Sequence, residues 1–445
     1  MNKKNLTRID VFSVALGSII GWGAFMLPGN KFLVESGVIN TFLGLVLGAI
    51  AIIIIEKSYG RMIGIHNDNG GEFSYIYKEL GERHGFNCGW FLSLAYLSII
   101  PLNATAFPLV VNKVLNGALQ FGYLYNIAGY DIYLGEVIVS SLIILFFAFI
   151  NSRGLKKTLK IQNLITIFLI LFVFVISIGM FIKVDCTQLN NTYIRGNEIR
   201  FSEVFKIFAI APWAFIGFDS IPQLTQNMKF STKKASKIAI LSIVFAAIIY
   251  NLLNVITGMV YAPEMLNGVD WPTGMAVLNN LGNIFFFMLV CSLTFAVWGG
   301  INGFMISTNK LMTSMAEHKV LPSIFVKRNK FGETQNIIIF ISVISLIAPW
   351  FGRKVLTWIV DMSSIGAAIT YLYVCYIMFK KEINIKDRII GALGSALSIL
   401  FIILLLCPES PAMLEKESFI ALIIWIILGL SYFILKGRKI NKHII

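Results

Sequence analysis

The sequence predicts an all-α integral membrane protein with about twelve transmembrane helices, and three observations lead to this fold class. The chain of 445 residues is 57% hydrophobic and only 13% charged, whereas soluble domains carry about a quarter charged residues. Its mean hydropathy is +0.78. Apolar runs of the roughly 20 residues needed to cross a bilayer recur along the whole length. No stretch is long and polar enough for a soluble domain, so residues 1–445 are expected to form one membrane domain.

The formal net charge of +14 does not indicate nucleic-acid binding. Lys and Arg stand in short clusters between the apolar runs, which is the pattern that the positive-inside rule produces. The five Cys form no CxxC pair, and the spans carry no clusters of His or Asp suited to catalysis. We therefore expect no catalytic residues, no metal site and no cofactor. The basic N-terminus runs into a long apolar segment without a small-residue cleavage site, which favours a retained first span over a signal peptide.

The spans can be placed in order by the apolar runs between these basic clusters. They are expected near residues 10–35, 38–58, 86–112, 133–151, 160–182, 202–226, 236–261, 283–309, 335–351, 355–379, 388–407 and 418–436. Twelve spans put both termini on one side. Most of the 37 Lys and Arg then fall on that same side, which we expect to be cytoplasmic.

The first and sixth spans contain residues that weaken a helix. The first reads ALGSIIGWGAFMLPG over Ala15–Gly29, and the sixth reads FAIAPWAFIGFDSIPQ over Phe208–Gln223. Gly21 and Gly217 are five spans apart, so the two interrupted segments enter the membrane from opposite sides. This arrangement is the signature of an inverted repeat. We expect two repeat units of five spans, at about 9–183 and 202–380, and two additional helices over about 388–436.

Broken helices at membrane depth need partners for the freed backbone groups. One alternative is that the glycines serve close helix packing, and the spacing of Gly17 and Gly21 fits it. Two breaks at matching places in two half-repeats instead favour a substrate site at the midplane. Freed N–H groups at a half-helix start suit a carboxylate, and freed carbonyls suit an ammonium. Together they suit a free amino acid.

Four stretches carry a resemblance to a known family. They are GSIIGWGAFMLPG in span one, GGEFSYIYKELG over Gly70–Gly81, PWAFIGFDS over Pro212–Ser220 and KLMTSMAEHKVLP over Lys310–Pro322. In order and spacing they resemble the amino acid–polyamine–organocation transporter family. The resemblance covers about ten spans. It implies the inverted-repeat fold and secondary transport of amino acids by alternating access.

The resemblance also implies a set of substrate-binding residues. The unwound part of span one, whose N–H groups hold the substrate carboxylate in relatives, corresponds to Ser18, Gly21, Trp22 and Gly23. The unwound part of span six, whose carbonyls take the ammonium, corresponds to Ala211, Trp213, Ala214 and Phe215. Phe304 in span eight falls where relatives line the side-chain end of the pocket. For each residue the alternative is packing, and Trp22 either narrows the site or points away from it.

Asp219 is the most informative ionisable side chain, because a carboxyl group inside a span is expensive and usually functional. The family position is linked to gating or to protons, and burial would favour the protonated form. The alternative is that Asp219 accepts from a freed backbone amide at the break. His66, His84, His318 and His443 all fall in or beside loops, so none is expected to relay protons within the membrane.

The coupling ion stays open between a proton and sodium. Proton-coupled relatives carry a Lys where this chain has Leu169, and Thr225-Gln226 stand where an acidic pair is common. Ser292 and Thr294 offer hydroxyls for sodium, although such hydroxyls usually bond to their own helix. The buried amides Asn103, Asn251, Asn254 and Asn302 are expected to form interhelical hydrogen bonds, with one of them facing the pocket.

We therefore expect a permease of the cytoplasmic membrane for a neutral, apolar amino acid. No acidic residue other than Asp219 is expected near the site, so a cationic side chain would lack a partner. Because aromatic faces also hold cations, an exchanger of basic amino acids or polyamines is the alternative. A sensor without transport activity is a further one.

Overall fold

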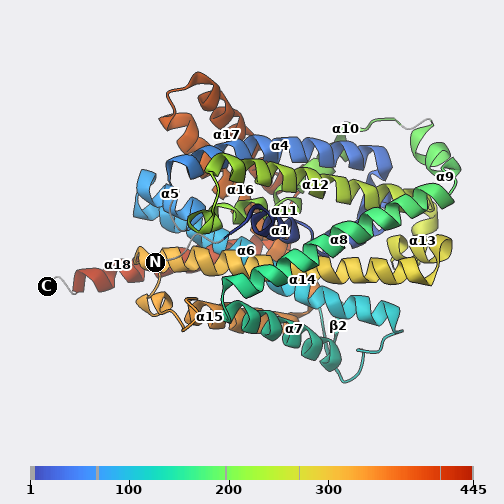
Figure 1. The fold of residues 1–445 in the computed structure, drawn as a ribbon, viewed down its shortest axis with the longest axis horizontal. Coiled ribbons are helices and arrows are strands. Elements are labelled where there is room, and N and C mark those ends of the chain that lie inside the picture. Colours follow the sequence, from blue (N-terminus) through green and yellow to red (C-terminus); the bar gives the residue numbers. More distant parts are fainter. Residues whose placement is uncertain (1–5, 67–69, 196–197, 270, 411, 443–445) are drawn as a thin grey trace.

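The long helices run side by side along one direction (Figure 1). The structure is a computed structural model, and it describes residues 6–66, 70–195, 198–269, 271–410 and 412–442, with side chains up to 436. Among these residues, nine helical segments are long and apolar enough to cross a bilayer: α4 (Gly37–Ile65), α6 (Glu82–Val114), α7 (Leu134–Ser152), α8 (Leu155–Lys183), α12 (Thr232–Gly258), α14 (Asn283–Glu317), the segment Gln335–Lys381, α17 (Ile385–Leu406) and α18 (Lys416–Lys442).

The first span is broken, as predicted. α1 (Arg8–Ile19) starts at a capping box between Thr7 and Asp10. It is followed by extended backbone at Ile20 and Gly21. A second helical stretch then runs over Trp22–Glu35 at 48° to the first. This stretch comprises α2 (Trp22–Leu27), a π-helical turn η1 (Pro28–Phe32) and α3 (Leu33–Glu35). Counted as one span, the bent pair brings the candidate spans within the described residues to ten.

The predicted sixth span is more irregular than expected. It contains α10 (Phe201–Ala209) and α11 (Ala211–Ala214), and then only 3₁₀ turns, η3 (Phe218–Ser220) and η4 (Pro222–Asn227). Gly217 has φ +124°, which ends the helix. Pro222 removes a backbone donor just beyond it. The predicted interruption is present, and beyond it the segment continues only as 3₁₀ turns.

The predicted ninth and tenth spans both lie within Gln335–Lys381. They appear as α15 (Gln335–Ile347), the turn η7 (Ala348–Phe351) and α16 (Gly352–Lys381). By length and composition the described chain thus holds nine or ten candidate spans rather than twelve. The all-α character is confirmed, because the strands of the described residues are confined to one hairpin, β1 (Tyr123–Ile127) and β2 (Tyr130–Tyr133).

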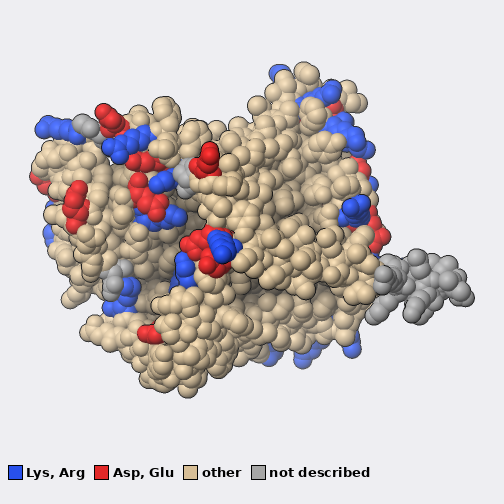
Figure 2. Space-filling view, turned by 180° about the vertical axis from the view of Figure 1, so that it is seen from behind, with Lys and Arg blue, Asp and Glu red and all other residues tan. Residues whose placement is uncertain are grey.

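The remaining short elements mark the two ends of the helix bundle. The hairpin end carries β1, β2, α9 (Thr187–Leu189), η2 (Asn190–Ile194), η5 (Pro263–Leu266) and α13 (Pro272–Leu281). The opposite end, here called the basic end, carries α5 (Gly71–Leu80), η6 (Ser323–Val326) and most of the Lys and Arg between the spans. Figure 1 shows these two groups at opposite ends of the long helices, and Figure 2 shows Lys and Arg along the right-hand edge, which is the basic end.

The helices approach closely where glycines lie at the contacts. A Cβ placed on Gly366 of α16 would lie 2.8 Å from the backbone oxygen of Phe91 in α6. Since the obstacle is backbone, α6 itself would have to shift. Glycine at this position therefore sets the distance between two of the central helices.

We expect Gly366→Ala to lower the melting temperature of the detergent-purified protein, because overpacking typically destabilises by about 1–3 kcal/mol. Gly64→Ala is the matched control. A Cβ on Gly64 of α4 would meet only Thr232 Oγ1 at 3.8 Å. Alanine there should be neutral or stabilising by up to about 1 kcal/mol. Equal melting temperatures for the two variants would contradict this packing.

Candidate functional site

The two broken spans lie against each other, and glycines make the contact possible. A Cβ on Gly217 would fall 2.7 Å from Ser18 Cβ and 2.8 Å from the backbone nitrogen of Ile19. A Cβ on Gly23 would overlap the ring of Trp213. Ser18 and Gly23 of the first break and Trp213 of the second are thus brought together, as the sequence predicted.

The second half of the broken first span starts at a cap provided by another helix. The N–H of Trp22 donates to Asn103 Oδ1 of α6 at 3.2 Å, and Asn103 Nδ2 donates to Ile99 O at 3.1 Å. A Cβ on Gly21 would lie 2.9 Å from Asn103 Oδ1. Gly21 has φ −121°, which any residue can adopt. Lack of space, and not an unusual backbone conformation, is therefore what requires glycine here.

Asp219 caps the break in the sixth segment. Its Oδ1 accepts from the N–H of Gly217 at 2.8 Å. The side chain is fully buried, and Oδ2 has no hydrogen-bond partner within the described residues. The hydroxyl of Tyr96 donates to the backbone oxygen of Asp219 at 3.2 Å. The expected alternative role, satisfying a freed backbone amide, is present.

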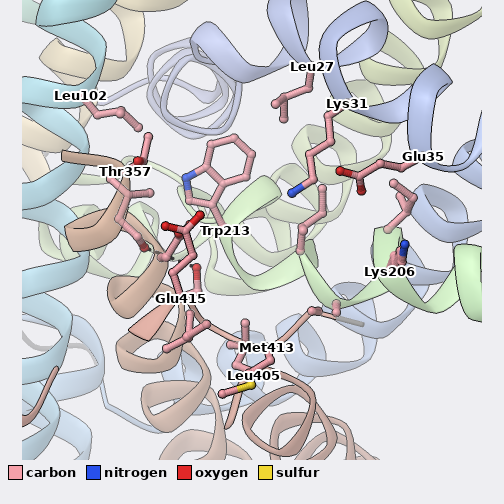
Figure 3. Close-up of a pocket in the computed structure, with 18 of the residues that line it drawn as sticks. Leu27, Lys31, Glu35, Leu102, Lys206, Trp213, Thr357, Leu405, Met413 and Glu415 are labelled. Carbon is pink, nitrogen blue, oxygen red and sulfur yellow. Dashed lines mark hydrogen bonds between the residues drawn. The ribbon is translucent and has the colours of Figure 1, made fainter. Parts of the chain in front are cut away.

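A cavity of about 350 Å³ lies beside the two breaks toward the hairpin end. Trp22 and Trp213 line it together with the start of α16 and the segment between α17 and α18. In Figure 3, Lys31 and Glu35 reach it from one side, Glu415 and Thr357 lie on the other, and Trp213 stands between them. The volume falls within the range of about 300–1,000 Å³ found for small-molecule sites.

The cavity wall carries both signs of charge. Lys31 and Lys206 are the lining cations, and Glu35, Asp361 and Glu415 are the lining anions. Glu415 also accepts from Lys354 at 3.0 Å. The ammonium group of Lys354 lowers the pKa of Glu415 below its usual value, so this carboxyl group is ionised at neutral pH.

The position of Asp361 corrects one sequence-based expectation, namely that no acidic residue other than Asp219 lies near the site. Instead Asp361 lines the same cavity as Trp22 and Trp213, whereas Asp219 does not line it. The sequence places Asp361 in the tenth span but carries no signal for the side of the helix that faces the cavity.

Most of the predicted binding residues lie beneath the cavity wall. Ser18, Gly21, Gly23, Ala211, Ala214, Phe215 and Phe304 do not line it. Phe304 is fully buried and packs on Tyr96 with ring centroids 5.5 Å apart. Phe215 is also fully buried and packs edge-on against Tyr250 at 6.3 Å. Of the predicted set, only Trp22 and Trp213 face the cavity, so Trp22 narrows it.

Sequence reasoning missed Arg353, at the start of α16. Its guanidinium carbon lies 4.3 Å from the ring centroid of Trp22. Nη1 donates to Leu102 O at 3.1 Å and to Thr105 Oγ1 at 3.3 Å. The sequence signal was a basic residue between two apolar runs, which we assigned to a loop. In the structure Arg353 thus contacts both Trp22 and the part of α6 nearer the hairpin end.

The residues considered for ion coupling are all engaged in the helix core. Leu169 is buried in α8. The hydroxyls of Ser292 and Thr294 donate to the carbonyls of Met288 and Val290 in their own helix, at 2.9 Å each, as the alternative to a sodium site predicted. Within the described residues no three His, Cys, Asp or Glu side chains lie close enough to hold a metal ion.

We expect Asn103→Ala to destabilise the protein, because it leaves the N–H of Trp22 buried without an acceptor. Such a loss costs about 1–3 kcal/mol. The matched control is Asn280→Ala, since Asn280 Nδ2 bonds only within its own helix, to Ala276 O at 2.8 Å. Thermal unfolding in detergent should show a clear drop for the first variant and a smaller one for the second. A larger drop for Asn280→Ala would contradict the capping role.

Comparisons with known proteins show which proteins this chain resembles. The family model described as amino acid permease matches residues 6–437. The branched-chain amino acid permease BcaP of Bacillus subtilis (strain 168) is 22% identical, with 99% of this chain and 94% of BcaP covered. The glutamate/serine transporter AimA of the same strain is 25% identical over 82% of this chain and 69% of AimA. The serine/threonine exchanger SteT of that strain is 24% identical, with 72% of this chain and 70% of SteT covered.

These matches assign the chain to a family of transporters rather than of enzymes. The several long apolar helices identify it as a multi-pass membrane protein. The resemblance seen in the four sequence motifs is confirmed over nearly the whole length. The chain belongs to the amino acid permease family.

Proposed function

We propose that this chain is a secondary transporter that moves neutral amino acids across the cytoplasmic membrane by alternating access. The observation that carries the proposal is the contact of the two broken spans, Gly217 on Ser18 and Gly23 on Trp213, beside a cavity of about 350 Å³. Interrupted helices that meet at membrane depth are the usual construction of a transporter site.

The architecture that goes with this proposal is the twelve-span inverted repeat. Units 9–183 and 202–380 each begin with an interrupted segment, and α17 and α18 are additional helices. The basic end then faces the cytoplasm. Both termini belong to that side, although residues 1–5 and 443–445 lie outside the described residues. The cavity faces the outside.

The proposed transport cycle needs one end closed while the other is open. Toward the hairpin end, the cavity reaches Glu415 and Thr357 near the helix ends. Toward the basic end, Tyr59, Tyr96, Tyr371 and Asp219 are all buried. The arrangement fits a state that accepts a substrate from outside and is sealed toward the cytoplasm.

A neutral amino acid suits the charges of the cavity best. A zwitterion brings one charge of each sign, and lining residues of both signs are present. A second cation on the substrate would need its own carboxylate. Asp361 lines the cavity and could supply it, so Asp361 is the first residue to mutate in testing the alternative with basic substrates. The relatives named above are transporters of branched-chain amino acids, of serine and threonine, and of glutamate and serine.

Counterflow in liposomes tests transport directly. Vesicles loaded with unlabelled leucine, alanine or serine should accumulate the labelled amino acid transiently. Gly23→Val should reduce this counterflow at least tenfold, because its side chain displaces Trp213 from the cavity wall. Gly64→Val places the same side chain where there is space, so this variant should keep the counterflow of the parent protein. Saturable binding without counterflow would identify a sensor instead.

Competition tests the substrate class. Leucine, alanine or serine should compete for uptake, whereas arginine, lysine and putrescine should not. If arginine competes strongly and Asp361→Asn abolishes that competition, the neutral assignment is wrong and the exchanger of basic amino acids is favoured. Glu35→Gln, which removes another carboxylate of the same cavity, is the matched control.

A further inference from the structure

Two carboxyl groups are buried together near the basic end. Glu72 belongs to α5, which lies outside the spans, and Asp219 belongs to the sixth segment. Both side chains have 0% exposure. Gln223, one turn beyond Asp219, donates from Nε2 to Glu72 Oε2 at 2.7 Å. The two carboxyl groups are close enough for their charges to interact.

Within the part of the chain that the structure describes, no ion pair neutralises the two carboxyl groups. Glu72 Oε1 and Asp219 Oδ2 are buried without a hydrogen-bond partner within the described residues. The titratable groups from the helices packed around the pair are hydroxyls and one thiol, on Tyr59, Cys88, Tyr96 and Tyr371. Basic side chains that contact α5 do so elsewhere on that helix: Lys381 and His66 bind Glu79, and His318 packs on Phe73 and Tyr77.

Two hydroxyl groups beside the pair also lack partners. Tyr59 and Tyr371 are 1% and 0% exposed. Their ring centroids are 6.0 Å apart, and both rings pack on Phe218, the neighbour of Asp219. Neither hydroxyl has a hydrogen-bond partner in the described part of the chain. Two carboxyl oxygens and two neighbouring hydroxyl groups therefore lie buried together without hydrogen-bond partners among the described residues.

A proton is the ligand that this chemistry favours. Two unpaired carboxylates in a dry interior cannot both stay ionised, because desolvation and mutual repulsion each favour the neutral form. Burial raises the pKa of Glu72 well above its ordinary value, and the charge of Asp219 raises it further. A protonated carboxyl group also has an O–H that can donate a hydrogen bond to one of the unpartnered oxygens around it.

We propose that Glu72 and Asp219 form a proton-binding site that is occupied while the basic end is closed and emptied when that end opens to water. This inference rests on the proposed alternating access, and it adds a site that includes α5. On opening, water solvates both carboxyl groups, the O–H bond breaks, and the proton leaves to water on the cytoplasmic side. On closing, one proton returns to the pair from water.

The sign of the pH dependence follows from proton counting. The closed state binds one proton more than the open state, so low pH favours closure and rising pH favours opening. A single proton limits the change in the open-to-closed ratio to tenfold per pH unit. Replacing Glu72 by Gln leaves one carboxylate, which Gly217 N–H already stabilises, and should remove the dependence.

Cys88 reports the opening of this end. It is fully buried in α6 and within electrostatic range of Glu72. With Cys186, Cys291, Cys375 and Cys407 replaced by Ser, alkylation by a water-soluble maleimide is measured in detergent from pH 5.5 to 8.5. Each rate is divided by the rate of the unfolded protein at the same pH, which removes the chemistry of the thiol itself. No amino acid is present, so the result does not depend on whether the protein transports.

The normalised rate of the parent protein should rise with pH, and that of Glu72→Gln should stay flat. Glu56→Gln is the matched control, since Glu56 of α4 is also buried but accepts from Ser236 Oγ at 3.1 Å instead of from Gln223. It should keep the parent slope. If Glu72→Gln fails to fold, Gln223→Leu serves instead. Loss of its hydrogen bond to the Glu72 carboxylate should shift the rise to higher pH.

Four results of the alkylation series would overturn the proposal, and a fifth would come from the addition of sodium. They are a parent rate independent of pH, an unchanged slope in Glu72→Gln, a slope lost equally in Glu56→Gln, and an unshifted rise in Gln223→Leu. The last measurement tests whether the pair binds sodium instead of a proton. If sodium chloride suppresses alkylation at pH 8.5 and choline chloride does not, the pair binds a metal cation and the assignment to a proton is wrong.

Discussion

Backbone groups that leave a helix inside an apolar bundle must find new partners, and this constraint governs the centre of the molecule. Asn103 accepts from Trp22 at the first break, and Asp219 accepts from Gly217 at the second. Glycine at positions 21, 23 and 217 lets the partner side chains and the two chain segments approach. The cavity exists beside these breaks because the segments are capped by side chains rather than by continuing helix.

The structure around the breaks differs between the hairpin end and the basic end. Toward the hairpin end, charged side chains of both signs line a cavity wide enough for a small molecule. Toward the basic end, the chain instead packs tyrosines, Phe218 and two buried carboxyl groups against α5. A transporter needs this asymmetry in each of its states. In the proposed transport cycle, the carboxyl pair would make the opening of the basic end depend on pH.

Part of the fold and of the candidate site could be predicted from the sequence. Glycine and proline in two apolar runs located both breaks, because these residues act locally on the backbone. The predicted spans mostly match the helices within a few residues. Helix rotation is not local, so the cavity-facing side of Asp361 and the contact of Arg353 with Trp22 could not be predicted. The cap from Asn103 depends on how α6 packs, and pattern analysis gave it only as a buried amide. The pairing of Glu72 with Gln223 joins segments far apart in the chain.

The most direct test of the central claim is an experimental structure with a bound amino acid, using whichever of leucine, alanine or serine supports counterflow. The account predicts ligand density between the two breaks, in contact with Trp22 and Trp213 and next to Gly23. Ligand density confined to the part of the cavity around Glu415 and Lys206, away from both breaks, would contradict the account.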